Sequence, residues 1–572
     1  MTNHHPLNDP GALAAGAMLK RMAERGVELV FANSGTDFAP IVEALARDTK
    51  GQLPRFVTVP HENLAVAMAN GYYRMTGKPA VVMCHVTVGT ANALCNLMNA
   101  ARDNVPIVLM AGRTPSSETG HPASRNSFIH WGTEAFDQGG IVREYVKWDY
   151  ELRQGQPVAD VIDRALDIAM TEPRGPVYLT LPREILCDPA IPKRRHDLHS
   201  LGATAPQPSL EAIGHAAAIL AQAKFPLIIA GASGRTQKGF DLLTRLAQEF
   251  AIPVSQPHAR ELAIASDHPM AVGGNPHALL PDADAILVLD NAVPWLPGTA
   301  GPNADAKVIH LSSDPLAMRY PFREYEADLL ITGENVASLE ALLGALRATA
   351  QIPPARLDER RARVAGIREA NAERRAEVIG RVAKAEFADG SWIAHCLGQQ
   401  MAPDALVVNE LGFNDLGFLA PKTWGSYLAP SLAGGLGFAL GGALGAKLAN
   451  PDREVIVCCG EGSYMFGNPV PYHFMQLAEK LPTLTIISNN SAWHAVRVAT
   501  LSVFPDGAAA KSNDMPVTSL TPSPDYEKIV GSIGGYGEKV ERPSDLPDAL
   551  ARGLAAVRAG QPAVLNVLTR GR

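Results

Sequence analysis

In the last third of the sequence, one apolar run is followed by a carboxylate and the next apolar run ends in two amides. In CCGEGSYMFGNPVPYHFMQLAEKLPTLTIISNN, residues 458–490, Glu461 lies in a glycine turn, and Asn489 and Asn490 end the second run. If the two runs are neighbouring parallel strands, these side-chain oxygens meet at one edge of a sheet. The turn would also open a helix, whose free N–H groups and dipole favour a phosphate. Carboxylate and amide oxygens are suitable ligands for Mg²⁺ bound to a phosphate. The alternative to such a binding site is an acidic βα turn followed by an asparagine cap at the end of the next strand.

The elements that must position these groups alternate between strand and helix along the chain. Short apolar runs predict strands, and the stretches between them have apolar residues at helical spacing. The runs are residues 27–35, 55–62, 79–86, 105–112, 175–182, 226–234, 252–259, 283–295, 306–315, 405–412, 453–460, 483–490 and 562–569. This alternation predicts an α/β fold with parallel, doubly wound sheets.

Two breaks in the alternation divide the chain into three predicted domains. A proline-containing segment of mixed charge at residues 187–210 has the composition of a linker. The strongly charged helical stretch 355–385 is expected to be a solvated connector rather than an arm that binds nucleic acid. We therefore expect three α/β domains, at residues 1–190, 205–350 and 375–572.

Composition excludes several classes of protein. The 572 residues carry a formal charge of −7, without the basic footprint of a nucleic-acid-binding protein. No apolar run approaches the roughly 20 residues of a membrane span, and the N-terminal segment has no signal-peptide pattern. Six cysteines without a CxxC pair indicate neither a disulfide framework nor a zinc site. A cytoplasmic enzyme that binds neither nucleic acid nor membranes is the default expectation.

The glycine turn and the asparagine pair together resemble a known cofactor motif. Gly-Asp-Gly followed by nearly thirty residues and Asn-Asn is the diphosphate-binding motif of thiamine diphosphate (ThDP) enzymes, and Glu461 stands where that family usually has Asp. The resemblance implies that Gly462, Ser463 and Asn490 bind the diphosphate. It also implies that Glu461, Asn490 and the backbone carbonyl of Ala492 hold Mg²⁺. Because the Glu side chain is one methylene longer than Asp, either the turn retracts slightly or the coordination changes.

Other segments match the same family in the order pyrimidine-binding, middle and diphosphate-binding domain, over essentially the whole chain. VPHENLAVAMANGYYRMTGKPA resembles the segment with the glutamate that activates the cofactor, which would be Glu62; an acid beside a helix start is the alternative. SLAGGLGFALGGALGAKLANP resembles the segment beneath the cofactor, where Gly434 would accept from the 4′-amino group and Leu436 would press between the two rings. VVNELGFND places Gly412 and Phe413 near the diphosphate.

Substrate-side residues follow from the same resemblance. CHVTVGTANALCNLMNA is similar to the segment of benzoylformate and pyruvate decarboxylases that brings a histidine to the reacting carbonyl, here His85, and a strand-end histidine bonded to backbone is the alternative. FANSGT places Thr36 near the substrate. Trp493 and His494 would line the active-site entrance or pack the following loop.

One histidine-containing segment fits no mechanism from spacing alone. The segment RTPSSETGHPASRNSFIHWGTEAFDQGG, with His121, His130 and Trp131, has the character of a loop that faces substrate or a second subunit.

The resemblance implies a ThDP- and Mg²⁺-dependent lyase that decarboxylates a 2-oxo acid through an enamine, with carboligation to an acceptor as a further outcome. The alternatives are an acetolactate synthase-like carboligase, a 2-hydroxyacyl-CoA lyase, and a non-catalytic scaffold that binds the cofactor. The family places Glu62 and the cofactor on different subunits, so a homodimer or homotetramer is expected. FAD is not predicted, because a lone glycine turn in the middle domain is weak evidence for it.

Overall fold

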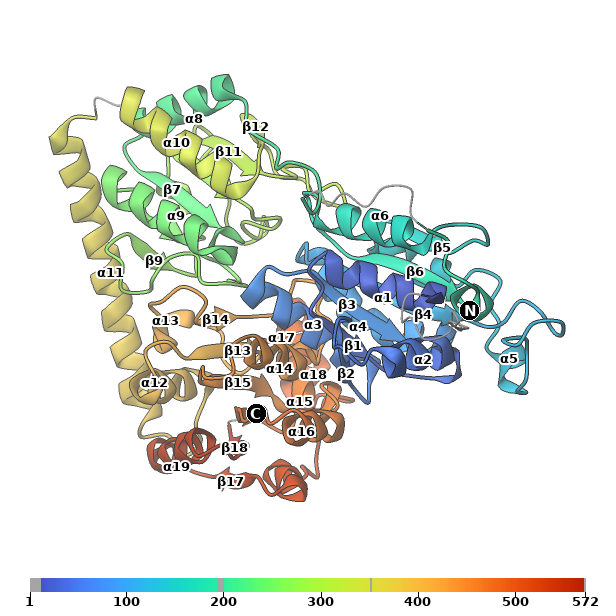
Figure 1. Ribbon diagram of the computed structural model, residues 1–572. Helices are drawn as coiled ribbons and strands as arrows, with labels where there is room; N and C mark the ends of the chain where they lie inside the picture. The colour runs from blue at the N-terminus through green and yellow to red at the C-terminus, as the bar shows by residue number, and fades with distance from the viewer. Residues whose placement is uncertain (1–11, 193–199, 350–351, 570–572) are drawn as a thin grey trace. The chain divides into compact units, whose positions relative to one another are not determined.

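The computed structural model describes residues 12–192, 200–349 and 352–569, and these residues form three six-stranded sheets (Figure 1). All strand pairs within the sheets are parallel, and helices connect the strands. The predicted α/β fold with three doubly wound parallel sheets is confirmed. The predicted domain boundaries stay a prediction, and part of the predicted linker lies outside the described residues.

The first of two compact units comprises residues 1–204, 430–451 and 466–479. Its sheet has the strand order β2-β1-β3-β4-β6-β5. The strands are β1 Leu29–Ala32, β2 Arg55–Thr58, β3 Ala80–Cys84, β4 Ile107–Arg113, β5 Asp149–Glu151 and β6 Val177–Pro182. The α-helices are α1 Ala14–Glu24, α2 Ala39–Arg47, α3 Glu62–Thr76, α4 Val86–Arg102, α5 Ile129–Gly132, α6 Val158–Met170, α7 Arg183–Cys187, α14 Phe438–Ala449 and α16 Pro469–Ala478.

Helices α3 and α14 of this unit pack at unusually close range because glycines lie at their contact. A Cβ atom at Gly71 would come within 2.0 Å of the carbonyl oxygen of Gly442, and one at Gly445 within 1.9 Å of that of Met68. Any side chain at these two positions would therefore force the helices apart. The glycine-rich run that follows Leu436 thus has a packing role in addition to any role beneath a cofactor.

The second compact unit comprises residues 205–429, 452–465 and 480–572 and contains two sheets. Their strand orders are β12-β11-β10-β7-β8-β9 and β14-β13-β15-β16-β18-β17. The strands are β7 Pro226–Ala230, β8 Val254–Ser255, β9 Ala271–Gly273, β10 Ala285–Leu289, β11 Lys307–Ser312, β12 Leu329–Thr332, β13 Leu406–Glu410, β14 Tyr427–Leu428, β15 Val455–Gly460, β16 Leu484–Asn489, β17 Tyr536–Val540 and β18 Ala563–Leu568. The α-helices are α8 Leu210–Gln222, α9 Gln237–Phe250, α10 Asn335–Thr349, α11 Pro354–Val382, α12 Gly390–Gln400, α13 Leu416–Leu419, α15 Glu461–Phe466, α17 His494–Val503, α18 Ala508–Ser512 and α19 Leu546–Arg558.

The long charged helix α11 is helical as predicted, but one of its turns is buried. Arg360 is only 1% exposed, and its guanidinium group donates to the carbonyl oxygens of Phe250 at 2.9 Å and Leu220 at 3.0 Å. Val364, one turn later, belongs to the core of the sheet that contains β7. This part of α11 therefore stabilises that domain rather than serving only as a solvated connector.

Candidate active site

The glycine turn at residues 460–463 lies between two neighbouring strands. Strand β15 ends at Gly460, helix α15 begins at Glu461, and β15 pairs in parallel with β16, with Gly460 opposite Ser488. The expected meeting of the two strand ends at one sheet edge is confirmed. The segment after β16 carries Asn490 and Ala492 back toward the turn.

The Glu461 carboxylate is buried at this edge and faces that segment. One carboxylate oxygen accepts from the Ala492 N–H at 2.9 Å and the other from the Asn490 N–H at 3.4 Å. The side-chain oxygen of Asn490 accepts from the same Ala492 N–H at 2.9 Å, and the Ala492 carbonyl accepts from the His494 N–H at 2.8 Å. Burial raises the pKa of Glu461. The three residues predicted to hold the metal thus surround one turn.

The donor set at this turn fits a Mg²⁺–diphosphate group. The Ser463 hydroxyl is buried and has no hydrogen-bond partner within the described part of the chain, so a phosphate oxygen would satisfy it. In the described ranges, no cluster of three or more His, Cys, Asp or Glu side chains could hold a metal ion. Mg²⁺ does not need such a cluster, because it commonly combines one or two carboxylates with water and substrate phosphates.

Trp493 covers the same turn, whereas His494 does not. A Cβ atom at Gly462 would lie 2.2 Å from the Trp493 ring, so only glycine at this position allows the indole to lie there. The Trp493 N–H donates to the Thr518 carbonyl at 2.8 Å, which fixes the backbone that carries the ring. His494 is exposed as the first residue of α17.

Gly412 and Phe413 form a turn after strand β13 that one buried amide holds in place. The side-chain oxygen of Asn409 accepts from the N–H groups of Gly412 at 3.1 Å and Phe413 at 3.2 Å, and its amide nitrogen donates to the Phe413 carbonyl at 3.0 Å. A Cβ atom at Gly412 would lie 2.7 Å from the backbone of Cys458 in β15. The turn therefore lies against the neighbouring strand.

In the first compact unit, Glu62 is the first residue of helix α3 and is 7% exposed. The His61 side chain caps the helix by accepting from the Asn63 N–H at 3.2 Å. One Glu62 carboxylate oxygen accepts from the Asn92 amide at 3.2 Å. A Cβ atom at Gly89 would lie 3.2 Å from the other oxygen, so the glycine leaves that side of the carboxylate open.

A chain of buried asparagines links the start of α3 to the segment before α14. Asn96 donates to the Asn63 carbonyl at 3.1 Å, and Asn99 donates to the Asn96 side chain at 2.8 Å and to the Gly435 carbonyl at 2.7 Å. The Gly435 N–H returns a hydrogen bond to Asn99 at 3.2 Å. Gly434 and Leu436 flank this contact. Gly434 has a φ of +71°, and the Leu436 carbonyl lies 3.9 Å from the Cys95 sulfur.

His85 and Thr36 lie in the same unit, and the structure adds a residue that the sequence interpretation missed. His85 lies between strand β3 and the start of helix α4, and its Nδ1 lies 2.5 Å from a carboxylate oxygen of Asp37. Asp37 directly follows Thr36 in a 3₁₀ turn after β1, and β1 pairs with β3. The hydrogen bond to Asp37 raises the pKa of His85. The acid next to Thr36 in SGTD was the only sequence signal for this pair.

The predicted residues therefore form two groups, one in each compact unit. Thr36, Glu62, His85, Gly434 and Leu436 lie in the first unit. The second unit contains Gly412, Phe413, Glu461, Gly462, Ser463, Asn490, Ala492, Trp493 and His494.

Comparisons with known proteins agree over the length of the chain. Family models match residues 14–141 (thiamine pyrophosphate enzyme, N-terminal TPP binding domain), 213–342 (central domain) and 416–567 (C-terminal TPP binding domain). Benzoylformate decarboxylase of Pseudomonas aeruginosa is 28% identical, with 96% of this chain and 97% of that protein aligned. A probable acetolactate synthase of Mycobacterium bovis is 25% identical, with 97% and 95% aligned.

A solved structure agrees with the fold. The ThDP-dependent 4-hydroxybenzoylformate decarboxylase of Rhodococcus jostii has a TM-score of 0.78 at 22% identity and covers 98% of this chain and 100% of its own. Within the described ranges, no helix is both long and apolar enough to span a bilayer. Three successive domain models, relatives aligned almost end to end and the three-sheet architecture lead to one conclusion: the chain belongs to the ThDP-dependent enzymes of the decarboxylase and acetolactate synthase family.

Proposed function

We propose that this protein is a ThDP- and Mg²⁺-dependent lyase that decarboxylates a 2-oxo acid. The observation that carries the proposal is the His85–Asp37 pair next to Thr36, because it provides a positioned acid–base group after the carboxyl ends of strands β1 and β3. The similarity to a benzoylformate decarboxylase supports the same class of substrate.

In this proposal the cofactor is held by groups that the fold already orients. Glu461, Asn490 and the Ala492 carbonyl would hold Mg²⁺, and Ser463 and the N–H groups at the start of α15 would hold the diphosphate. When bound, ThDP supplies an electron sink for the electron pair released as a carbon–carbon bond breaks. Glu62 would hold a proton at the pyrimidine ring, with Asn92 fixing the direction of its carboxylate.

On the substrate side, His85 would hold and transfer a proton at its Nε2 atom. Its Nδ1 is committed to Asp37, so the imidazole keeps one orientation through the reaction. Transfer of this proton to the substrate carbon that has lost CO₂ would yield an aldehyde. Reaction of the same carbon with a second carbonyl compound would yield a carboligation product. The similarity to an acetolactate synthase favours this second outcome as the alternative.

We extend the proposal to assembly as a homodimer or homotetramer. Helix α16 carries an exposed apolar stripe, with Val470 69%, Phe474 46% and Leu477 58% exposed. Spacings of four and three residues place these side chains on one face of the helix. A second copy of the chain would cover such a face, as the family resemblance also implies.

The substitution Glu62→Gln tests the function. We expect a loss of turnover of about 10²- to 10⁴-fold with ThDP still bound, because the amide cannot exchange a proton. Purified protein with ThDP and Mg²⁺ would be assayed for CO₂, aldehyde and acyloin over a panel of 2-oxo acids, and ThDP binding by calorimetry. Glu43→Gln, on the exposed face of α2, is the matched control.

The outcomes separate the alternatives. CO₂ with aldehyde supports the decarboxylase, and CO₂ with acyloin or acetolactate supports the carboligase. Turnover unchanged in Glu62→Gln, or undiminished after Mg²⁺ is chelated, would contradict the mechanism. Tight ThDP binding by the unsubstituted protein without turnover of any 2-oxo acid would favour the scaffold.

A further inference from the structure

The loop after strand β4 contains a buried histidine to which no role has been given. His130 lies in the short helix α5 and is 4% exposed. Its Nδ1 accepts from the Asn126 N–H at 3.2 Å. Because a neutral imidazole with an accepting Nδ1 carries its proton on Nε2, His130 presents an Nε2–H donor. In the described ranges the hydrogen bond at Nδ1 is the only one that the His130 ring makes, so Nε2 has no partner there.

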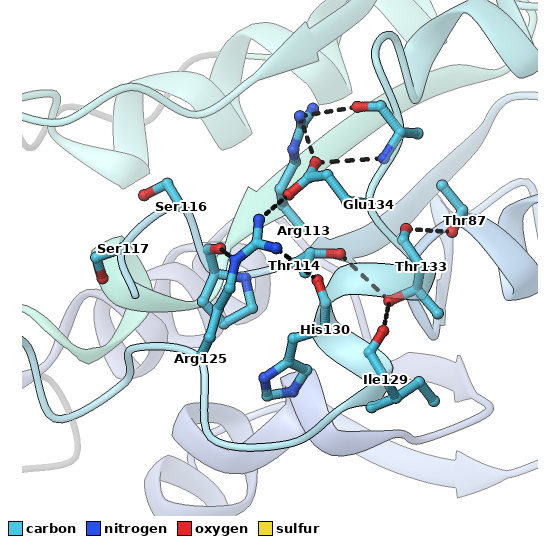
Figure 2. A network of polar contacts seen from close by, with 12 residues as sticks. Thr87, Arg113, Thr114, Ser116, Ser117, Arg125, Ile129, His130, Thr133 and Glu134 are labelled. Atoms are coloured by element: carbon cyan, nitrogen blue, oxygen red, sulfur yellow. Dashed lines mark hydrogen bonds and ion pairs between the residues drawn. The ribbon is translucent and has the colours of Figure 1, made fainter. Parts of the chain in front are cut away.

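The backbone around His130 is held by ionic and polar contacts, as Figure 2 shows. Arg125 donates to the His130 carbonyl at 2.9 Å and forms an ion pair with Glu134. Arg113, in strand β4, contacts Glu134 at 2.8 Å and the Ala135 carbonyl at 3.0 Å. The His130 ring lies on the side of its backbone away from Arg113 and Glu134, so none of these anchoring groups uses it.

Two further contacts connect this loop to the substrate-side residues. Thr87, two residues after His85, donates to the Thr133 carbonyl at 2.8 Å (Figure 2). The buried guanidinium of Arg183 bonds the carbonyls of Ala123 at 2.8 Å and Ser124 at 2.7 Å, and it also lies 3.4 Å from the Thr36 carbonyl. The loop is therefore fastened both to helix α4, which directly follows His85, and to the turn that carries Thr36 and Asp37.

The electrostatic surroundings of the two histidines differ. Burial lowers the pKa of His130, and the positive charges of Arg183, Arg125 and His85 lower it further. The hydrogen bond to Asp37 raises the pKa of His85. Groups whose pKa values are moved apart in this way suit different tasks, here a neutral donor and a proton-carrying acid.

The geometry points to His130 as a second substrate-binding residue of this enzyme, whose Nε2–H donates a hydrogen bond to an oxygen of the 2-oxo acid beside His85. The inference rests on the proposed function and adds a specificity-determining residue to it. A donor held on a rigid loop loses little conformational freedom when substrate binds, and it positions the acid for His85.

Two substitutions test the roles of the two ring nitrogens of His130 separately. His130→Asn keeps an acceptor near the Nδ1 position, which preserves the bond to the Asn126 N–H, but loses the distal donor. His130→Gln keeps a donor near the Nε2 position. With ThDP, Mg²⁺ and benzoylformate or pyruvate as probes, we expect His130→Asn to raise KM about tenfold or more, the worth of one hydrogen bond, and His130→Gln to retain most of the affinity.

If His130 had a purely structural role, His130→Gln would raise KM more than His130→Asn. That result would overturn the inference. His121 provides the control, because its Nδ1 likewise accepts from a loop N–H, that of Ala123 at 3.0 Å, while its Nε2 faces Asp188 at 3.1 Å. The corresponding His121 variants should keep the KM of the unsubstituted protein, and an equal effect of both pairs of variants would also overturn it.

Calorimetry with the same two probes supplies a readout that does not depend on turnover. In the Glu62→Gln holoenzyme, adding His130→Asn should weaken probe binding about tenfold. Unchanged binding would overturn the inference while leaving the proposed function intact. If neither probe bound the parent holoenzyme and no 2-oxo acid were turned over, the proposed function would fail, and this inference with it.

Discussion

The Asp37 carboxylate raises the pKa of His85 and so favours its charged form. Asp37 is buried, and it lies 2.5 Å from the Nδ1 of His85. The negative charge of Glu62 also favours the charged form of His85. The positive charge of His85 in turn disfavours the charged form of His130. Residues of this kind work by fixing the orientation and the pKa of a neighbour, so Asp37 is a positioning residue in the proposed mechanism.

Asp37→Asn should move the alkaline limb of kcat/KM to lower pH. If His85 acts as an acid, activity falls as pH rises through its pKa, and Asp37 raises that pKa. Removing the carboxylate charge lowers the pKa of His85, so the limb shifts to lower pH. Asp188→Asn, which changes the Asp partner of His121, should leave the profile in place. A limb that stayed fixed in Asp37→Asn would remove His85 from the acid role.

At the scale of elements, the asparagine chain joins three segments that are far apart in sequence. Asn99 is fully buried and bonds Asn96, Gly435 and, at 3.3 Å, the Ser431 hydroxyl. Its amide satisfies backbone groups of a segment that has no regular secondary structure of its own. Such buried networks rigidify a structure only when every member is bonded, because an unpaired buried polar group is costly.

Asn99→Leu should therefore destabilise the protein by about 2–4 kcal/mol, since it leaves several buried groups unpaired. The loss is measured as a change in the urea midpoint, and amide hydrogen exchange should speed up in residues 431–437. Ala91→Leu, at an exposed position of the same helix, should change stability by about 0.5 kcal/mol or less. Equal effects of the two substitutions would show that the chain of amides contributes no special stability.

At the scale of the whole molecule, the stripe on α16 is a prediction about assembly. A charge at the centre of an apolar interface is expensive to bury, so Phe474→Asp should raise the dissociation constant of the assembly about 100-fold or more. Sedimentation over a range of concentrations measures this change. Val42→Asp, on α2, places the same charge at another exposed apolar residue and should leave the mass unaltered. A monomeric parent protein would refute the proposed assembly.

The strands that periodicity predicted and those that it missed differ in position. The five missed strands, β5, β9, β12, β14 and β17, are all edge strands, whereas the buried central strands were all predicted. Central strands of a parallel sheet are covered on both faces and appear as continuous apolar runs. Edge strands such as Asp149–Glu151 are short and partly exposed, so hydrogen bonding to a neighbour rather than apolar character makes them strands.

The sequence by itself determined the α/β class, the strand–turn–helix around Glu461 and the placement of Glu62 at a helix start, because each depends on local pattern and spacing. Only the tertiary structure decided that Asp37 contacts His85, that Asn99 bonds Gly435, and that His130 is fastened beside them. The contact between Asp37 and His85 joins residues 48 positions apart, and the contact between Asn99 and Gly435 joins residues 336 positions apart. The segment that carries His130 is connected through the hydrogen bond between Thr87 and Thr133. Such pairings arise from sheet order and helix packing, which the spacing of residues along the chain does not encode.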